Sequence, residues 1–229
     1  MELLHNGFTL DTLPGTFPLS TDSMVLCDFV RLPKNARVLD LGSGCGTLGL
    51  LLCAQDLRCS VTGIELDENA HYAALRNIGN NGLCDRMKSI CMDLRSFSPG
   101  SDAELYTACV SNPPYFSGGP ASAVSPLARR DDCCSADDLF STAGRCLRYG
   151  SDFFLVHKPD KLAQLCACAA KHNLEPKRLR LVRHHTGAEI SMILLQCRKG
   201  AKPGLLWEEI YLFDQNGVPT EDFKRIYHL

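Results

Sequence analysis

Apolar runs and helical periodicities alternate along most of the chain. Short apolar runs predict buried strands at residues 37–41, 60–65, 87–92, 106–110, 152–156, 178–183 and 190–197. Helical patterns lie at residues 47–55, 67–80, 135–147 and 161–172. Strands that alternate with helices of this length are typical of a parallel sheet covered on both faces. The pattern therefore predicts one α/β domain with a doubly wound, mostly parallel sheet of about seven strands.

The first residues follow a different pattern. Residues 1–18 are rich in turn signals, which predicts a strand pair or a small lid. Ser20-Thr21-Asp22 then precedes an apolar segment at residues 24–30, and this order is typical of a capped helix. We therefore interpret residues 1–30 as an N-terminal extension with a lid helix and residues 31–229 as the main domain.

A glycine-rich segment, Gly42-Ser43-Gly44-Cys45-Gly46, joins the strand at 37–41 to the helix at 47–55. A nucleotide-binding turn requires this order, because glycines let the backbone approach a ligand and the helix N-terminus faces it. Thr47 occupies the position at which a dinucleotide-binding loop carries its last glycine. The G-x-G-x-G spacing, with Asp40 before it, favours the loop that receives the methionine end of S-adenosylmethionine.

Acidic residues stand at the ends of the next two strands. Glu65 ends the second strand, where a carboxylate can accept hydrogen bonds from both hydroxyls of a ribose. Asp93 ends the third, where it could accept the amino group of an adenine; an ordinary loop aspartate is the alternative. Because the carboxyl ends of parallel strands share one edge, Asp40, Glu65 and Asp93 are expected to line one crevice.

The fourth strand ends in Ser111-Asn112-Pro113-Pro114-Tyr115. Two prolines stop a strand and make a rigid corner. The Asn112 side-chain oxygen and the Pro113 carbonyl could each accept an N–H of a planar nitrogen, while Tyr115 stacks on the group that carries it. These acceptors would draw the delocalised lone pair toward tetrahedral geometry, which makes the nitrogen a better nucleophile. An ordinary proline turn is the alternative for this motif taken alone.

Composition and charge narrow the class of protein. No apolar run is long enough to span a membrane and the N-terminus does not resemble a signal peptide, so we expect a cytoplasmic protein. The thirteen cysteines are then reduced thiols, and without C-x-x-C spacing they predict no metal site. Residues 145–202 carry 12 Lys/Arg against 4 Asp/Glu, although the net charge is −2. This asymmetry suggests one face for a polyanion, with plain solvated charge as the alternative.

With these motifs in place, the chain resembles class I S-adenosylmethionine-dependent methyltransferases. More closely it is similar to the bacterial tRNA(Val) (adenine-N6)-methyltransferase family, which acts next to the anticodon. The resemblance runs from about Leu19 to the C-terminus and includes Ser20-Thr21-Asp22 and Phe213-Asp214-Gln215-Asn216-Gly217. It implies a Rossmann-like sheet of seven strands, mostly parallel, whose last strand is antiparallel.

The resemblance also implies roles for individual residues. The cofactor S-adenosylmethionine is expected to contact Thr21, Asp40, Gly42, Ser43, Gly44, Gly46, Glu65, Leu66, Asp93, Leu94 and Asn112. The corner Asn112, Pro113, Pro114 and Tyr115 would receive an adenine turned out of its stack. We expect RNA contacts from Arg129, Arg130, Lys158, Lys177, Arg178, Arg180 and Arg183. No metal is needed, because the sulfonium supplies its own leaving group. We also expect a monomer.

Other classes share parts of these motifs. Release-factor glutamine methyltransferases carry the same corner but add a long helical N-terminal domain, whereas only some 30 residues precede the strand at 37–41 here. DNA adenine methyltransferases usually add a target-recognition domain, and guanine-N2 methyltransferases of ribosomal RNA usually have a duplicated domain. A non-catalytic protein that binds S-adenosylmethionine and RNA would not need the amine-accepting corner. The missing glycine disfavours a nicotinamide dehydrogenase.

Overall fold

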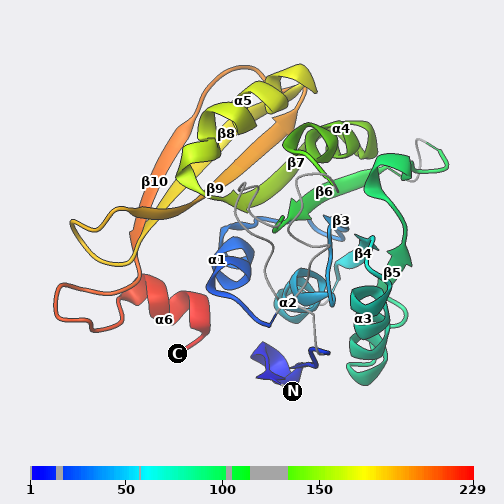
Figure 1. Ribbon diagram of the computed structural model, residues 1–229, viewed down its shortest axis with the longest axis horizontal. Coiled ribbons are helices and arrows are strands. Elements are labelled where there is room, and N and C mark those ends of the chain that lie inside the picture. Colours follow the sequence, from blue (N-terminus) through cyan, green and yellow to red (C-terminus); the bar gives the residue numbers. More distant parts are fainter. Residues whose placement is uncertain (1, 14–17, 57, 102–104, 114–133) are drawn as a thin grey trace.

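A computed structural model describes residues 2–13, 18–56, 58–101, 105–113 and 134–229. The central sheet contains eight strands in the order β10-β8-β9-β7-β6-β3-β4-β5. Their bounds are β3 (Arg37–Leu41), β4 (Ser60–Glu65), β5 (Met87–Cys91), β6 (Tyr106–Ser111), β7 (Leu147–His157), β8 (Leu174–Arg183), β9 (Ile190–Lys199) and β10 (Leu206–Tyr211). Figure 1 shows this sheet as a twisted layer through the molecule.

The sheet is mostly parallel, as predicted, but its details differ from the expectation. The last of the seven predicted strands, β9, is antiparallel as expected, and an eighth strand, β10, joins the sheet parallel to β8. Among the described strands of this sheet only β9 is antiparallel, and it lies between β7 and β8. The segment that starts near Trp207 was not predicted as a strand, because exposed Leu206 and Trp207 interrupt any regular alternation of buried and exposed positions.

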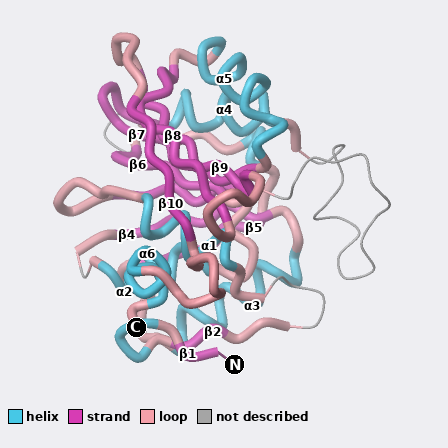
Figure 2. Tube along the Cα trace, turned by 90° about the vertical axis from the view of Figure 1, so that its left-hand side faces the viewer, coloured by secondary structure: helices cyan, strands magenta, loops and turns pink. Residues whose placement is uncertain are grey.

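Helices cover both faces of the sheet. Their bounds are α1 (Thr21–Phe29), α2 (Thr47–Gln55), α3 (Glu68–Asn80), α4 (Ala136–Cys146), α5 (Leu162–Lys171) and α6 (Glu221–Tyr227), with short 3₁₀ helices η1 (His5–Gly7), η2 (Leu94–Ser96) and η4 (Pro159–Lys161). One apolar cluster packs α1, α2 and α3 against one face, and a second packs α4 and α5 against the other. Figure 2 shows the sheet between the two layers.

The predicted strand pair near the N-terminus is confirmed. β1 (Glu2–Leu3) pairs antiparallel with β2 (Thr9–Leu10). Asn77 of α3 and Asn81, which follows this helix, bind the backbone of the N-terminal segment. The Asn81 Oδ1 accepts from Thr9 N at 2.7 Å, and the Asn77 Oδ1 accepts from Asp11 N at 2.8 Å. The N-terminal segment is therefore attached to the helix layer that also carries the glycine loop.

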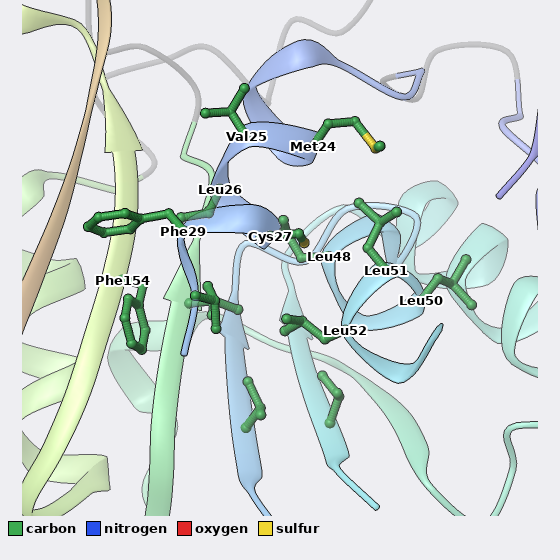
Figure 3. Packing of buried hydrophobic residues seen from close by; sticks show 14 of the residues in the cluster. Met24, Val25, Leu26, Cys27, Phe29, Leu48, Leu50, Leu51, Leu52 and Phe154 are labelled. Carbon is green, nitrogen blue, oxygen red and sulfur yellow. The ribbon is translucent and has the colours of Figure 1, made fainter. Parts of the chain in front are cut away.

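Helix α1 starts at the predicted cap, because the Ser20 side chain accepts a hydrogen bond from Ser23 N. Its buried side chains contact the leucine-rich helix α2 and the strands below, as Figure 3 shows. Phe29, at the end of α1, meets Phe154 of β7 edge to face, with ring centroids 6.1 Å apart. Helix α1 is thus packed against strand β7 on one side and against helix α2 on the other.

The described cysteines are free thiols, and most are buried as small apolar side chains. Within the described residues, no helix is long and apolar enough to cross a membrane.

Candidate active site

The glycine loop lies between the end of β3 and the start of α2. Gly42, Gly44 and Gly46 all have positive φ, at 71°, 55° and 86°, which is the conformation that glycine adopts without steric cost. A Cβ at Gly42 or Gly44 would meet no atom within 4 Å, so the loop borders open space there. A Cβ at Gly46 would instead lie 2.9 Å from Met87 Cε. The first two glycines therefore leave room for a ligand, and the third allows close packing.

Glu65 ends β4 beside this loop, as predicted. Its Oε2 accepts a hydrogen bond from Gly44 N at 2.7 Å, and its Oε1 accepts one from Asp67 N at 2.8 Å. Burial raises the pKa of Glu65, and these backbone N–H groups offset that rise only in part. The carboxylate thus lies at the rim of the loop, where its remaining lone pairs can accept ribose hydroxyls.

Asp40 is a fully buried acid at the end of β3. Neither carboxylate oxygen has a hydrogen bond of normal geometry to the described residues. The backbone N–H of Gly49 is close enough to lower the pKa of Asp40, but this effect is smaller than that of burial. Burial and then the charge of Glu65 raise the pKa of Asp40 to about 8. The nearby Ser43 Oγ is also buried without a partner in the described chain. Two buried acids beside an open glycine loop suit a ligand that carries positive charge and hydroxyls.

The third strand-end acid, Asp93, caps η2. Its carboxylate accepts from Arg95 N and forms an ion pair with the Arg95 guanidinium at 2.5 Å, which lowers the pKa of Asp93 despite partial burial. Leu66 follows Glu65 and is 49% exposed, an unusual exposure for a leucine at a strand end. Leu94 packs partly against the apolar cluster under α4. Asp93 and Leu66 thus offer a hydrogen-bond acceptor and an apolar surface to a flat ring.

Asn112 stands beside this crevice because β6 pairs with β3, with Asp40 opposite Val110. Ser111 Oγ donates to Leu41 O at 2.8 Å, which joins the two strand ends where the glycine loop begins. The Asn112 Nδ2 donates to Ser23 Oγ at 3.0 Å, and Pro113 is buried behind it. Pro114 and Tyr115 lie outside the described residues, as do Arg129 and Arg130.

Two site residues were missed by the sequence patterns. Ser23 of α1 contacts Asn112, although 89 positions separate them. Asn77 of α3 donates to Cys45 O in the glycine loop at 3.0 Å. In the sequence each of these residues is a polar residue within a predicted helix, which is common. Only the contact seen in the structure identifies it as part of the site. Thr21, which is predicted to contact the cofactor, accepts a hydrogen bond from Tyr227 Oη at 3.0 Å.

The basic residues predicted to contact RNA separate into two groups. Arg180 is 4% exposed and pairs with Asp28 at 2.6 Å and with Glu208 at 2.8 Å. Arg178 also pairs with Glu208, at 2.7 Å, and both guanidinium groups lie over the Phe29 ring. Both guanidinium groups are thus engaged in ion pairs within the fold, which reduces the charge that they can present to RNA.

The remaining predicted contacts lie closer to the surface. Arg183 pairs with Glu209 at 2.6 Å. Lys177 donates to the Lys202 carbonyl at 2.9 Å, near the start of β8. Lys158 is exposed directly after β7, and because Ser111 pairs with Leu155, it lies at the same sheet edge as Asn112. Of the predicted RNA contacts among the described residues, Lys158, whose Nζ lies 3.4 Å from the Ser191 carbonyl, is the one that follows the strand next to β6, at the edge of the sheet that carries Asn112.

Comparison with known proteins identifies the fold and the family. Residues 8–164 match the model of the methyltransferase small domain. A tRNA1(Val) (adenine(37)-N6)-methyltransferase of Bacteroides fragilis is 31% identical over 74% of this chain and 72% of its own length. The enzyme of the same name from Photobacterium profundum is 27% identical over 90% of this chain and 87% of its own.

Solved structures support the same fold. A predicted O-methyltransferase from Agrobacterium tumefaciens superposes with a TM-score of 0.75 at 19% identity, covering 91% of this chain and 96% of that one. A geranyl diphosphate C-methyltransferase from Streptomyces coelicolor, crystallised with S-adenosylhomocysteine, gives a TM-score of 0.56 at 14% identity, over 77% of this chain and 76% of its own. With its glycine loop, its strand-end acids and the corner at Asn112, the chain belongs to the methyltransferase small domain family of S-adenosylmethionine-dependent enzymes, among the relatives of the tRNA1(Val) (adenine(37)-N6)-methyltransferases.

Proposed function

We propose that this protein transfers the methyl group of S-adenosylmethionine to the N6 amine of an adenosine in tRNA, next to the anticodon, in the cytoplasm. The observation that carries the proposal is the position of Asn112, whose carboxamide lies at the end of β6 beside the glycine loop. The relatives whose names specify adenine 37 of tRNA1(Val) support this choice of substrate.

The cofactor supplies an electrophilic methyl group on a positively charged sulfur. The residues at the crevice fit such a ligand, because Asp40 is buried and without a hydrogen-bond partner of normal geometry in the described chain, and Gly42 and Gly44 border open space. Asp40 would face the positive charge, Glu65 the ribose hydroxyls, and Asp93 with Leu66 and Leu94 the adenine. Each of these groups is a strand-end residue or its direct neighbour, so one sheet edge positions them all.

The role of Asn112 follows from the chemistry of the target amine. The lone pair of an exocyclic amine is delocalised into the ring, which makes it a weak nucleophile. The Asn112 Oδ1 and the Pro113 carbonyl would accept its two hydrogens and favour a tetrahedral nitrogen with its lone pair directed at the methyl group. Positioning and exclusion of water, rather than a general base, would then supply most of the rate enhancement. The proton released after transfer would leave to solvent.

The test is transfer of radiolabelled methyl groups into unmodified total tRNA and, in parallel, into release factors. We expect label in tRNA that is recovered as N6-methyladenosine after digestion. Label in the release factors would instead identify a glutamine methyltransferase. If neither substrate is labelled although the protein binds the cofactor, the protein would be a non-catalytic protein that binds S-adenosylmethionine and RNA.

Substitution Asn112→Ala tests the assigned role of the carboxamide. We expect kcat to fall roughly 100-fold or more, as when one preorganised polar group is removed from an active site, with the cofactor Kd within a few-fold. Asn80→Ala, at an exposed position at the end of α3, is the matched control and should retain activity. Equal losses of kcat and of cofactor affinity in Asn112→Ala would contradict a role in receiving the amine.

A further inference from the structure

The side-chain amide of Asn112 has two chemically different ends, and the proposed function needs only one of them at the target. The Oδ1 accepts hydrogen bonds, whereas the Nδ2 can only donate. A carboxamide turned by 180° would present N–H groups to an amine that also presents N–H groups. Two donors facing each other repel, so the corner works only with the oxygen toward the substrate.

In the structure this amide faces helix α1 with its nitrogen. Asn112 Nδ2 donates to Ser23 Oγ at 3.0 Å, and Ser23 is 5% exposed. With the nitrogen bound to helix α1, the oxygen is directed away from that helix. Since no water competes freely for so buried a hydroxyl, the cost of breaking this hydrogen bond favours a single orientation.

Ser23 is itself held in place by the cap of its helix. The Ser20 Oγ accepts the backbone N–H of Ser23 at 3.2 Å and lies 3.2 Å from the Ser23 hydroxyl. When the Ser23 hydroxyl donates to Ser20, its lone pairs are left to accept from Asn112. Helix α1 is anchored at both ends, by Tyr227 on Thr21 and by Phe29 on Phe154, so Ser23 has a fixed position relative to β6.

We propose that Ser23 is a positioning residue that holds the Asn112 carboxamide with its oxygen toward the target amine. The proposal rests on the proposed function, because it concerns the same methyl transfer. It adds a residue from α1 to a site whose acidic and amide side chains Asp40, Glu65, Asp93 and Asn112 lie at or just after the ends of strands. Ser23 does not touch the substrate in this scheme and acts only through Asn112.

Kinetics of Ser23→Ala provide the first test. Without the acceptor the amide can take either orientation, and we expect kcat at saturating cofactor and tRNA to fall about 10- to 100-fold, as for a misplaced catalytic group. The Kd for S-adenosylhomocysteine should stay within about twofold. Val25→Ala is the control, since it truncates a buried apolar side chain two positions along the same helix. A loss of kcat in Val25→Ala that matches the loss in Ser23→Ala would assign the effect to helix packing and overturn the proposal.

A second readout does not depend on activity. The side-chain NH₂ resonances of Asn112, identified by their disappearance in Asn112→Asp, should exchange slowly with solvent in the unmodified protein and at least tenfold faster in Ser23→Ala. Unchanged exchange in Ser23→Ala would overturn the proposal even if the enzyme modifies tRNA. Protected resonances in a protein that labels no RNA would support the contact and contradict only the proposed function.

Discussion

At the scale of single residues, the distinctive feature of this site is a buried acid whose oxygens make no hydrogen bond of normal geometry to the described residues. Asp40 is completely buried, and its pKa of about 8 reflects burial first and the neighbouring charge of Glu65 second. A positively charged ligand would favour the carboxylate form and so lower this pKa. Cofactor binding below pH 8 should therefore release a proton from Asp40.

This linkage predicts a pH-dependent affinity. Between pH 6 and pH 7.5 the cofactor must displace the Asp40 proton, so its affinity should rise with pH, by at most about tenfold per pH unit. Calorimetry of cofactor binding in two buffers of different ionisation enthalpy measures the proton release directly. Asp40→Asn should bind the cofactor more weakly and lose most of the pH dependence. The same pH slope in this variant would show that another group titrates.

At the scale of elements, ion pairs of Asp28 connect helix α1 to residues of the C-terminal half of the chain. Asp28 accepts from Arg180 at 2.6 Å and from Arg225 of α6 at 2.9 Å. Burial alone would raise the pKa of Asp28, but the hydrogen bonds from Arg225 and Arg180 outweigh it and lower the pKa. The stabilisation by this carboxylate is present above its unfolded pKa and is lost as the pH falls through the lower folded value.

Removing one partner of this network should be costly. Arg180→Leu leaves Asp28 and Glu208 partly buried with fewer partners, and we expect the free energy of unfolding to fall by about 3 kcal/mol. Lys224→Leu is the control, because Lys224 is 47% exposed and its partner Glu221 is 88% exposed; its effect on the free energy of unfolding should stay below about 1 kcal/mol. Urea unfolding of both variants measures the difference. Similar costs would contradict a buried network that attaches α1.

At the scale of the whole molecule, the sheet has one functional edge. The strands that carry Asp40, Glu65 and Asn112 run parallel, and β7 ends at the same edge with Lys158. An RNA that delivers a base to Asn112 would therefore pass over this edge. The internal pairing of Arg178 and Arg180 means that the basic composition of residues 145–202 overstates the charge available to RNA.

Lys158→Ala tests this footprint. The loss of one phosphate contact should weaken tRNA binding. It should also reduce, by about 1, the steepness with which the logarithm of the association constant falls with the logarithm of the salt concentration. Lys34→Ala makes the same change of charge at an exposed position before β3, at the opposite edge of the sheet, and should leave the slope unchanged. Filter binding over a range of salt concentrations compares the two variants. Equal slopes for both would remove Lys158 from the RNA contact.

The order of strands, glycines and acids along the chain was sufficient to place the candidate site residues at one edge of the sheet. Asp40, Glu65 and Asp93 each follow an apolar run that forms a strand. Parallel strands have their carboxyl ends at the same edge of the sheet, independently of how the connecting helices pack. Asn112 is placed by the same rule. The family and the mostly parallel sheet were predicted correctly for this reason, because each depends on local pattern and on the direction of strands.

Tertiary structure alone decided which polar groups meet across long separations. Hydrogen bonding by Ser23 to Asn112, the burial of Arg178 and Arg180, and the addition of β10 to the sheet all involve segments far apart in the sequence. A serine in a helix or an arginine in a strand has the same local pattern whether it faces solvent or a buried partner. The sequence by itself determined the edge at which the chemistry lies, whereas packing of distant segments determined how Asn112 is oriented and which charges remain available.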